Sequence, residues 1–127
     1  MLHPNLFTFT DLQAEGDKLK TTIKLNAGHS IFKGHFPGQP VLPGVCMMQM
    51  VKEVTEIYTD KKIRLQKARE LKFLSFIDPI EHPSIQMELS IKTTDDGIKV
   101  DARLLNDTTL FFKFSGLFIS DNAFLLI

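Results

Sequence analysis

The sequence lacks several features that mark common classes of protein. Of its 127 residues only one, Cys46, is a cysteine, so an internal disulfide is excluded. No apolar run approaches the ~20 residues that a helix needs to cross a bilayer, so no membrane association is expected. The N-terminus has neither the basic nor the apolar region of a secretory signal. These absences favour a cytoplasmic protein.

The chain also lacks an excess of either charge, repeats and low-complexity tracts. Its 15 basic and 15 acidic side chains balance, whereas domains that bind nucleic acids usually carry a strong positive excess. No nucleic-acid partner is therefore expected. The basic residues cluster locally, with six of them between Lys61 and Lys72 against one acid, Glu70. This run either steers an acidic partner or forms a solvated strand face.

Hydrophobic residues make up 43% of the chain, enough for one domain over residues 1–127. Lys18–Asn26 and Ser84–Lys92 alternate apolar and polar residues, the period of a half-buried strand. The inward-facing positions are Leu19, Thr21, Ile23 and Leu25 in the first, and Ile85, Met87, Leu89 and Ile91 in the second. Further strands are expected before Glu15-Gly16-Asp17, over Ile63–Phe76, over Ile98–Leu105 and over Leu110–Ile119.

One long helix is predicted, from Gly44 to about Thr59, with Pro43 at its start. Its first two turns are apolar nearly all round, so the helix should be enclosed. Five or six antiparallel strands and one enclosed helix predict an α+β fold in which a sheet wraps around a central helix. Gln49 is the only strongly polar residue between Gly44 and Val51, and a buried carboxamide needs hydrogen-bond partners.

Residues 34–45, GHFPGQPVLPGV, form the most informative segment. Glycine and proline occupy six of these twelve positions, and the segment leads directly into the predicted helix. It places a histidine, His35, near a helix N-terminus, whose free N–H groups can stabilise a developing oxyanion. A rigid loop with an incidental histidine is the alternative interpretation.

This segment resembles the signature of the 3-hydroxyacyl-acyl-carrier-protein dehydratases of the FabZ and FabA types, and the resemblance extends from about His29 to Ser120. It implies a hotdog fold, a dimer with active sites at its interface, and elimination of water from a 3-hydroxyacyl thioester to give a trans-2-enoyl thioester. It further implies acyl carrier protein as partner, no metal or organic cofactor, and a place in fatty-acid or polyene-type synthesis.

The resemblance also implies roles for individual residues. His35 matches the histidine that takes the C2 proton, and the N–H of Gly44 matches the donor to the thioester carbonyl. Phe36 and Val45 are expected to bind substrate. Position 49 departs from the pattern, because the family carries a catalytic glutamate or aspartate where this chain has Gln49. A carboxamide can orient a water or a hydroxyl but has no acidic proton to donate near neutral pH.

Glu53 lies four residues after Gln49, which reverses the family's order of acid and glutamine. Positions i and i+4 share a helix face about 6 Å apart. Glu53 is therefore expected either to act as a displaced catalytic acid, to hold Gln49 in place, or to begin a solvated end of the helix. A carboxyl group enclosed in the site should have a raised pKa.

Other candidates have simpler interpretations. His3, His29 and His82 are expected at the surface, and Cys46 in the apolar interior. Six phenylalanines suit either the core or an acyl tunnel: Phe73, Phe76, Phe111, Phe112, Phe114 and Phe118.

Because of Gln49, three functions remain open: a FabZ-like dehydratase, a hotdog acyl-thioesterase, and a catalytically weakened subunit that binds acyl chains. The dehydratase agrees best with the complete loop around His35. The partner chain could be a second copy, in a homodimer or higher homo-oligomer, or an intact relative.

Overall fold

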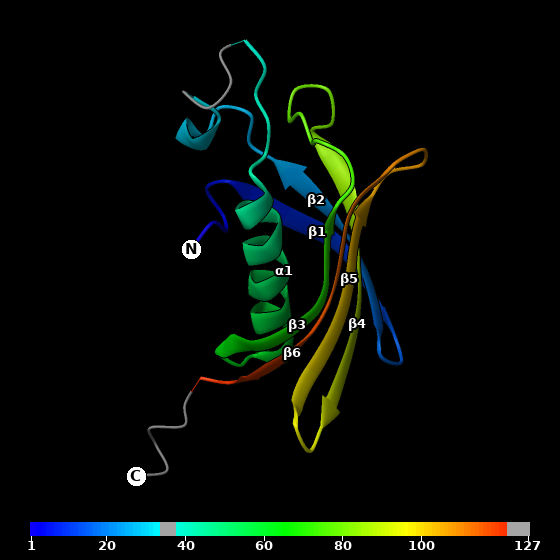
Figure 1. The fold of residues 1–127 in the computed structure, drawn as a ribbon. Helices are drawn as coiled ribbons and strands as arrows, with labels where there is room; N and C mark the ends of the chain where they lie inside the picture. The colour runs from blue at the N-terminus through cyan, green and yellow to red at the C-terminus, as the bar shows by residue number, and fades with distance from the viewer. Residues whose placement is uncertain (34–37, 122–127) are drawn as a thin grey trace.

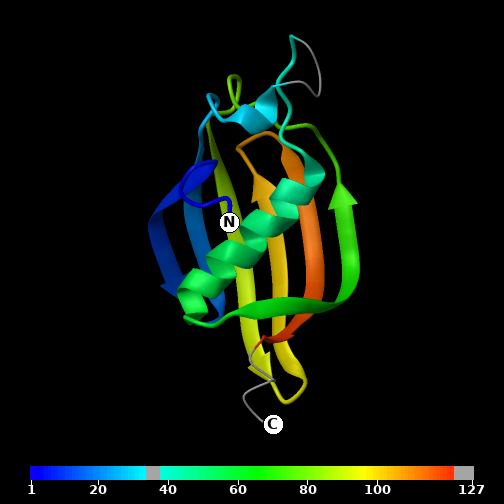
Figure 2. The ribbon, with the colours of Figure 1, turned by 90° about the vertical axis from the view of Figure 1, so that its left-hand side faces the viewer.

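A computed structural model describes residues 1–33 and 38–121. Six strands form one antiparallel sheet in the order β1-β2-β4-β5-β6-β3. Helix α1 lies across the concave side of this sheet (Figures 1 and 2). The strands are β1 (Phe7–Glu15), β2 (Lys18–Leu25), β3 (Ile63–Phe73), β4 (Ser84–Thr94), β5 (Gly97–Leu105) and β6 (Leu110–Ser120); α1 is Gly44–Thr59, and a short 3-10 helix spans Ser30–Phe32.

This architecture confirms the predicted hotdog fold, a bent sheet around one central helix. The alternation in β2 is confirmed as well, since its four apolar-pattern residues are buried and its lysines are exposed. In β4, Ile85, Met87 and Leu89 are buried, and Ile91 is partly buried. The predicted strand Ile63–Phe76 is too long at its end. It stops at Phe73, because the N–H groups of Leu74 and Ser75 both turn to the carbonyl of Phe111.

The edge strand β3 follows α1 in the chain and bends sharply beneath the end of that helix (Figure 2). Its pairing with β6 shifts register twice, between Leu65 and Lys67 and between Ala68 and Glu70. Gly116 of β6 faces this irregular stretch. A Cβ at Gly116 would lie 2.7 Å from the carbonyl oxygen of Lys67 and 2.5 Å from Cζ of Phe114. Only glycine allows the two backbones to approach so closely, which lets β3 curve around the helix.

Only one side of α1 is covered by the sheet. Met47, Met50, Val51 and Val54 are buried in the common core with the phenylalanines of β6. The opposite side is enclosed only in part, since Val45 in the first turn is 75% exposed whereas Glu53, two turns later, is buried. The prediction of an enclosed helix is therefore correct for the sheet side and only partly correct for the outward side of a single chain. No described helix is long and apolar enough to span a membrane.

Candidate active site

The N-terminal end of α1 is held in place but left uncapped. The N–H of Leu42 donates to the carbonyl of Ile77 at 2.8 Å, which ties the incoming segment to the loop after β3. Pro43 is extended, and this N-cap residue makes no side-chain capping hydrogen bond. Within residues 1–33 and 38–121, no acceptor is found for the N–H groups of Gly44 and Val45. These donors lie at the positive end of the helix dipole and can bind a ligand oxygen.

Gly44 packs closely against an aromatic ring. A Cβ at Gly44 would lie 2.8 Å from Cε1 of Phe73, which itself stacks on Phe112 with ring centroids 5.3 Å apart. Beside this contact is a mainly apolar cavity of about 580 Å³, lined by residues 41–44, Met47 and residues 73–76. An apolar cavity beside free N–H donors suits a ligand with an apolar chain and a polar oxygen. A larger hollow of about 760 Å³ lies over β1, β2, β4 and β5, among charged residues remote from the motif.

The phenylalanines now separate into two groups. Phe111, Phe112, Phe114 and Phe118 are buried in the core. Phe73 and Phe76 line the cavity and are 51% and 77% exposed. The sequence alone did not distinguish these roles, because both require the same residue type.

Glu53 is fully buried, with 0% of its surface exposed. The expectation that it begins a solvated helix end is therefore wrong. Its carboxylate accepts hydrogen bonds from the N–H groups of Leu2, at 3.0 and 2.9 Å to its two oxygens, and His3, at 2.9 Å. The third donor is Nε2 of Gln49, at 2.9 Å. The N-terminal segment thus folds back onto α1 (Figure 2), where Leu2 and His3 contact Glu53.

These contacts also reverse the expected direction of the pKa. Burial raises the pKa of the Glu53 carboxyl, but the backbone N–H groups of His3 and Leu2 and the amide of Gln49 together hold the pKa below its ordinary value. Three donors stabilise the ionised form more than desolvation destabilises it. Near neutral pH, Glu53 is a carboxylate with no proton to give.

Gln49 is partly buried on the outward side of α1, one turn after the exposed Val45. Of the three alternatives for Glu53, the one in which it holds Gln49 in place matches this geometry. His35 and Phe36 lie outside the described residues. Of the predicted site residues, the structure therefore describes Gly44, Val45, Gln49 and Glu53, all on α1.

Cys46 is buried, and burial raises the pKa of its thiol, which fits the predicted packing role. His29 is partly buried, and its Nδ1 accepts the N–H of Ile31 at 3.0 Å at the start of the 3-10 helix. His3 is also partly buried, against the rings of Phe7 and Phe9. Both contacts hold local structure, and neither residue is as exposed as predicted. Nowhere in the described ranges do three or more His, Cys, Asp or Glu side chains gather to hold a metal.

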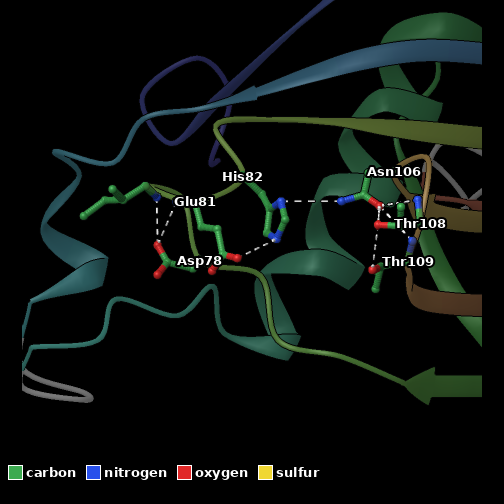
Figure 3. Close-up of polar contacts among 7 residues, drawn as sticks. Asp78, Glu81, His82, Asn106, Thr108 and Thr109 are labelled. Carbon is green, nitrogen blue, oxygen red and sulfur yellow. Dashed lines mark hydrogen bonds and ion pairs between the residues drawn. The ribbon is translucent and has the colours of Figure 1, made fainter.

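His82 belongs to a second polar cluster, which joins two turns (Figure 3). Its Nδ1 lies 3.4 Å from Nδ2 of Asn106, and its Nε2 lies 3.9 Å from Glu81. The other amide atom of Asn106, Oδ1, accepts hydrogen bonds from Thr108 and Thr109. His82 is partly buried with its ring edge on Phe111, so this cluster fastens the 78–82 turn to the 106–109 turn.

The basic run is exposed, and part of it is paired. Lys72 lies 3.7 Å from Glu70, which also approaches Lys113 of β6 at 3.6 Å. Arg64 lies 3.7 Å from Asp121. The ion pairs are on the surface, so each contributes little to stability.

Comparison with known proteins places this arrangement in a family. The family model named ApeI-like, described as ApeI dehydratase, matches residues 11–108. The chain belongs to the ApeI-like dehydratase family. The resemblance to FabZ-type dehydratases is confirmed by relatives of that name. The FabZ 3-hydroxyacyl-[acyl-carrier-protein] dehydratase of Escherichia coli O9:H4 (strain HS) is 33% identical over 110 residues, 76% of this chain and 73% of that protein.

A FabZ of Haemophilus influenzae (strain PittEE) is 34% identical over 83 residues, 61% of this chain. The match spans 55% of that relative's length. Among solved structures, the dehydratase heterocomplex ApeI:P from Xenorhabdus doucetiae aligns with a TM-score of 0.70 over 89% of this chain and 97% of that one, at 15% identity. A phenylacetic acid degradation-related protein from Ralstonia eutropha JMP134, provisionally assigned as a thioesterase, aligns with a TM-score of 0.63 over 90% and 85%, at 14% identity. These two likenesses concern the fold.

Sequence reasoning included the contact between Gln49 and Glu53 among its alternatives but missed the other two donors to Glu53. They are backbone N–H groups about fifty positions away in the chain, and the residues at 2 and 3 carry no pattern that reports such a contact. The only available signal was the apolar character of Leu2 and Leu6, which suits a segment that packs rather than one that projects into solvent.

Proposed function

We propose that this ApeI-like protein removes water from a 3-hydroxyacyl thioester carried by acyl carrier protein and forms a trans-2-enoyl thioester. The observation that carries the proposal is the uncapped N-terminus of α1 beside an apolar cavity, directly after the segment GHFPGQPVLPGV in the sequence. An acyl thioester has the matching features, an apolar chain and a carbonyl oxygen that gains charge when the neighbouring carbon loses a proton.

In this proposal each residue has a definite task. His35 takes the proton from C2 as general base. The N–H of Gly44 has no acceptor in the described part of the chain, and it donates to the thioester carbonyl oxygen. Phe36 and Val45 contact the acyl chain. Gln49, in the position of the family's catalytic acid, orients the 3-hydroxyl group. No cofactor is required, since proton transfer and C–O cleavage need none.

The active protein is proposed to be a dimer, with each site built from two chains. Two surfaces support this. The edge strand β3 presents eleven residues with exposed Leu65, Leu71 and Phe73, and an exposed edge of this kind favours pairing with another strand. The outward side of α1 adds the exposed Val45. We take the partner to be a second copy of this chain, in a homodimer or a larger homo-oligomer.

The decisive experiment is mass spectrometry of a 3-hydroxyacyl carrier-protein substrate after incubation with the purified protein. Loss of 18 Da, one water, is the expected result. Loss of the whole acyl group would instead identify a thioesterase. An unchanged mass of the 3-hydroxyacyl carrier protein would leave only a binding role.

Each of the two alternative functions has one observation in its favour. A carboxamide at position 49 can hold a water against a thioester, which favours hydrolysis as the second candidate. The third, an acyl-binding subunit weakened at Gln49, would require an intact partner, as in a heterocomplex. The solved ApeI:P assembly is named a dehydratase heterocomplex. Co-expression with such a partner, followed by the same mass measurement, would show whether activity needs two different chains.

A further inference from the structure

The Glu53 carboxylate restricts how Gln49 can be oriented. An ionised carboxylate only accepts hydrogen bonds, whereas a carboxamide carries a donor end and an acceptor end. Nε2 of Gln49 lies 2.9 Å from Oε2 of Glu53. If the amide were turned over, two oxygens would face each other at that distance. The NH₂ end is therefore fixed toward Glu53, and the carbonyl oxygen Oε1 points elsewhere.

Other contacts keep the carboxylate itself from moving. Leu2 and His3 donate to it through backbone N–H groups, and the ring of His3 packs against Phe7 and Phe9 with centroids 5.5 and 5.4 Å apart. Glu53 is fully buried by this arrangement. The N-terminal segment, Glu53 and Gln49 thus form a chain of hydrogen bonds that begins in the folded body and ends at a partly exposed amide.

The far end of that chain is free to bind. Within the described ranges, Gln49 has no hydrogen bond other than the one to Glu53, so Oε1 has no partner there. An oriented carbonyl oxygen recognises a hydroxyl hydrogen. Building on the proposed function, we propose that Glu53 is a positioning residue that presents Oε1 of Gln49 as the acceptor for the substrate's 3-hydroxyl group.

This arrangement accounts for dehydration without a carboxylic acid at position 49. The C2 proton passes to the imidazole of His35, and the C2–H electron pair forms the C2=C3 double bond. The C3–O bond breaks with its electron pair on oxygen. That oxygen, held by its own hydrogen to Gln49, then takes the proton from His35 and leaves as water. One base both removes and returns the proton, and Gln49 only holds the hydroxyl in line.

The matched pair of variants is Glu53→Gln and Glu56→Gln. Each replaces a helix carboxylate that accepts a backbone N–H, since Oε2 of Glu56 accepts the N–H of Ile63 at 3.0 Å. Of these two carboxylates, only that of Glu53 accepts a hydrogen bond from Gln49. We expect Glu53→Gln to lower kcat for a 3-hydroxyacyl thioester about ten-fold, the scale of one misplaced hydrogen bond, and Glu56→Gln to leave kcat unchanged. Equal effects of the two variants would overturn the positioning role.

Ligand discrimination gives a readout that a merely structural role would not move. Wild-type protein should bind a 3-hydroxyacyl thioester analogue more tightly than the saturated acyl analogue of the same length. Glu53→Gln should lose most of this difference while its affinity for the saturated analogue stays the same. A parallel loss of affinity for both analogues would indicate general damage to the site and contradict the proposal.

A swap of the two residues completes the test. Gln49→Glu combined with Glu53→Gln restores the family's order of acid and glutamine, and should recover at least wild-type kcat. Failure of the swap to exceed Glu53→Gln alone would count against coupling between the two positions. If wild-type protein turns over and Glu53→Gln matches it, only the positioning role fails. If wild-type protein produces no enoyl product at all, the proposed function fails and this inference falls with it.

Discussion

The two ends of helix α1 are completed in opposite ways. At the C-terminal end, Asp60 adopts a left-handed conformation (φ 54°, ψ 42°), its N–H returns to the carbonyl of Glu56, and the Glu56 carboxylate accepts the N–H of Ile63. At the N-terminal end no side chain caps the helix, and the first N–H donors have no acceptor in the described residues. A side-chain cap typically contributes about 1 kcal/mol, so leaving an end uncapped gives up stability.

One end of the helix thus maintains the fold, and the other is left open for a ligand. Between them lies Glu53, whose contacts link the middle of the helix to the N-terminal segment. Changes at the open end should therefore alter chemistry with little effect on stability, and changes at the closed end should do the reverse.

The largest effect is expected from His35→Ala at the loop that leads to the open end. Loss of a general base should lower the rate of water elimination by about 10²–10⁴-fold. Urea denaturation of the same variant should remain close to wild type, because the proposed role of His35 is in chemistry. Unchanged turnover would remove His35 from the mechanism.

Val45→Glu tests the outward surface of the open end. Val45 is 75% exposed in the single chain, and a charge there should oppose its burial against a second chain. Sedimentation should show wild-type dimers and mainly monomers of the variant, with activity lost in parallel. Leu12→Glu, a similarly drastic change on the opposite edge strand β1, serves as the control and should stay dimeric. If both variants sediment as wild type does, the proposed interface is elsewhere.

Glu53→Gln tests the region between the two ends through pH. The folded-state pKa of Glu53 lies below its ordinary value, so its stabilising contribution is present above the unfolded pKa of about 4.5 and is lost as the pH falls through the folded pKa. At pH 7 the variant should lose about 1.5–3 kcal/mol of unfolding free energy, the scale for hydrogen bonds to a charged group. Urea titrations at pH 7 and pH 3 should show the difference from wild type shrinking in acid. A constant difference would mean that ionisation is not involved.

Reversing charge just beyond the closed end should affect only the encounter with a carrier protein. Lys62→Glu with Arg64→Glu should raise KM for carrier-bound substrate several-fold, with a smaller effect at high salt. A small thioester analogue, which needs no protein docking, should keep its KM. Arg64 also approaches Asp121 on the surface, but such a pair contributes little, so stability should hardly change. Equal KM changes for both substrates would contradict docking through this run.

The position of α1 and of its two ends could be predicted from the sequence, because it depends on local signals. Pro43 marks the start of α1, and the apolar spacing carries it to Thr59, where the structure ends it. The exposure of Val45 was not predicted, because an apolar residue in a helix suits a core and an interface equally. The burial of Glu53 was missed for a different reason. It depends on the N-terminal segment folding back across fifty residues, and surface glutamates are far commoner than buried ones.

The smallest effect is expected at Asp60, the left-handed residue of the closed end. A non-glycine residue in this conformation costs roughly 1–2 kcal/mol, partly offset for aspartate and by the greater unfolded-state entropy of glycine. Asp60→Gly should therefore raise the free energy of unfolding by less than about 1 kcal/mol, measured by urea denaturation. Asp60→Ala, which keeps a Cβ and loses the polar side chain, is the matched control and should be destabilised. Both variants should keep wild-type kcat, since the closed end takes no part in the proposed chemistry. A change in kcat with unchanged stability would show that the two ends of the helix are not separate in function.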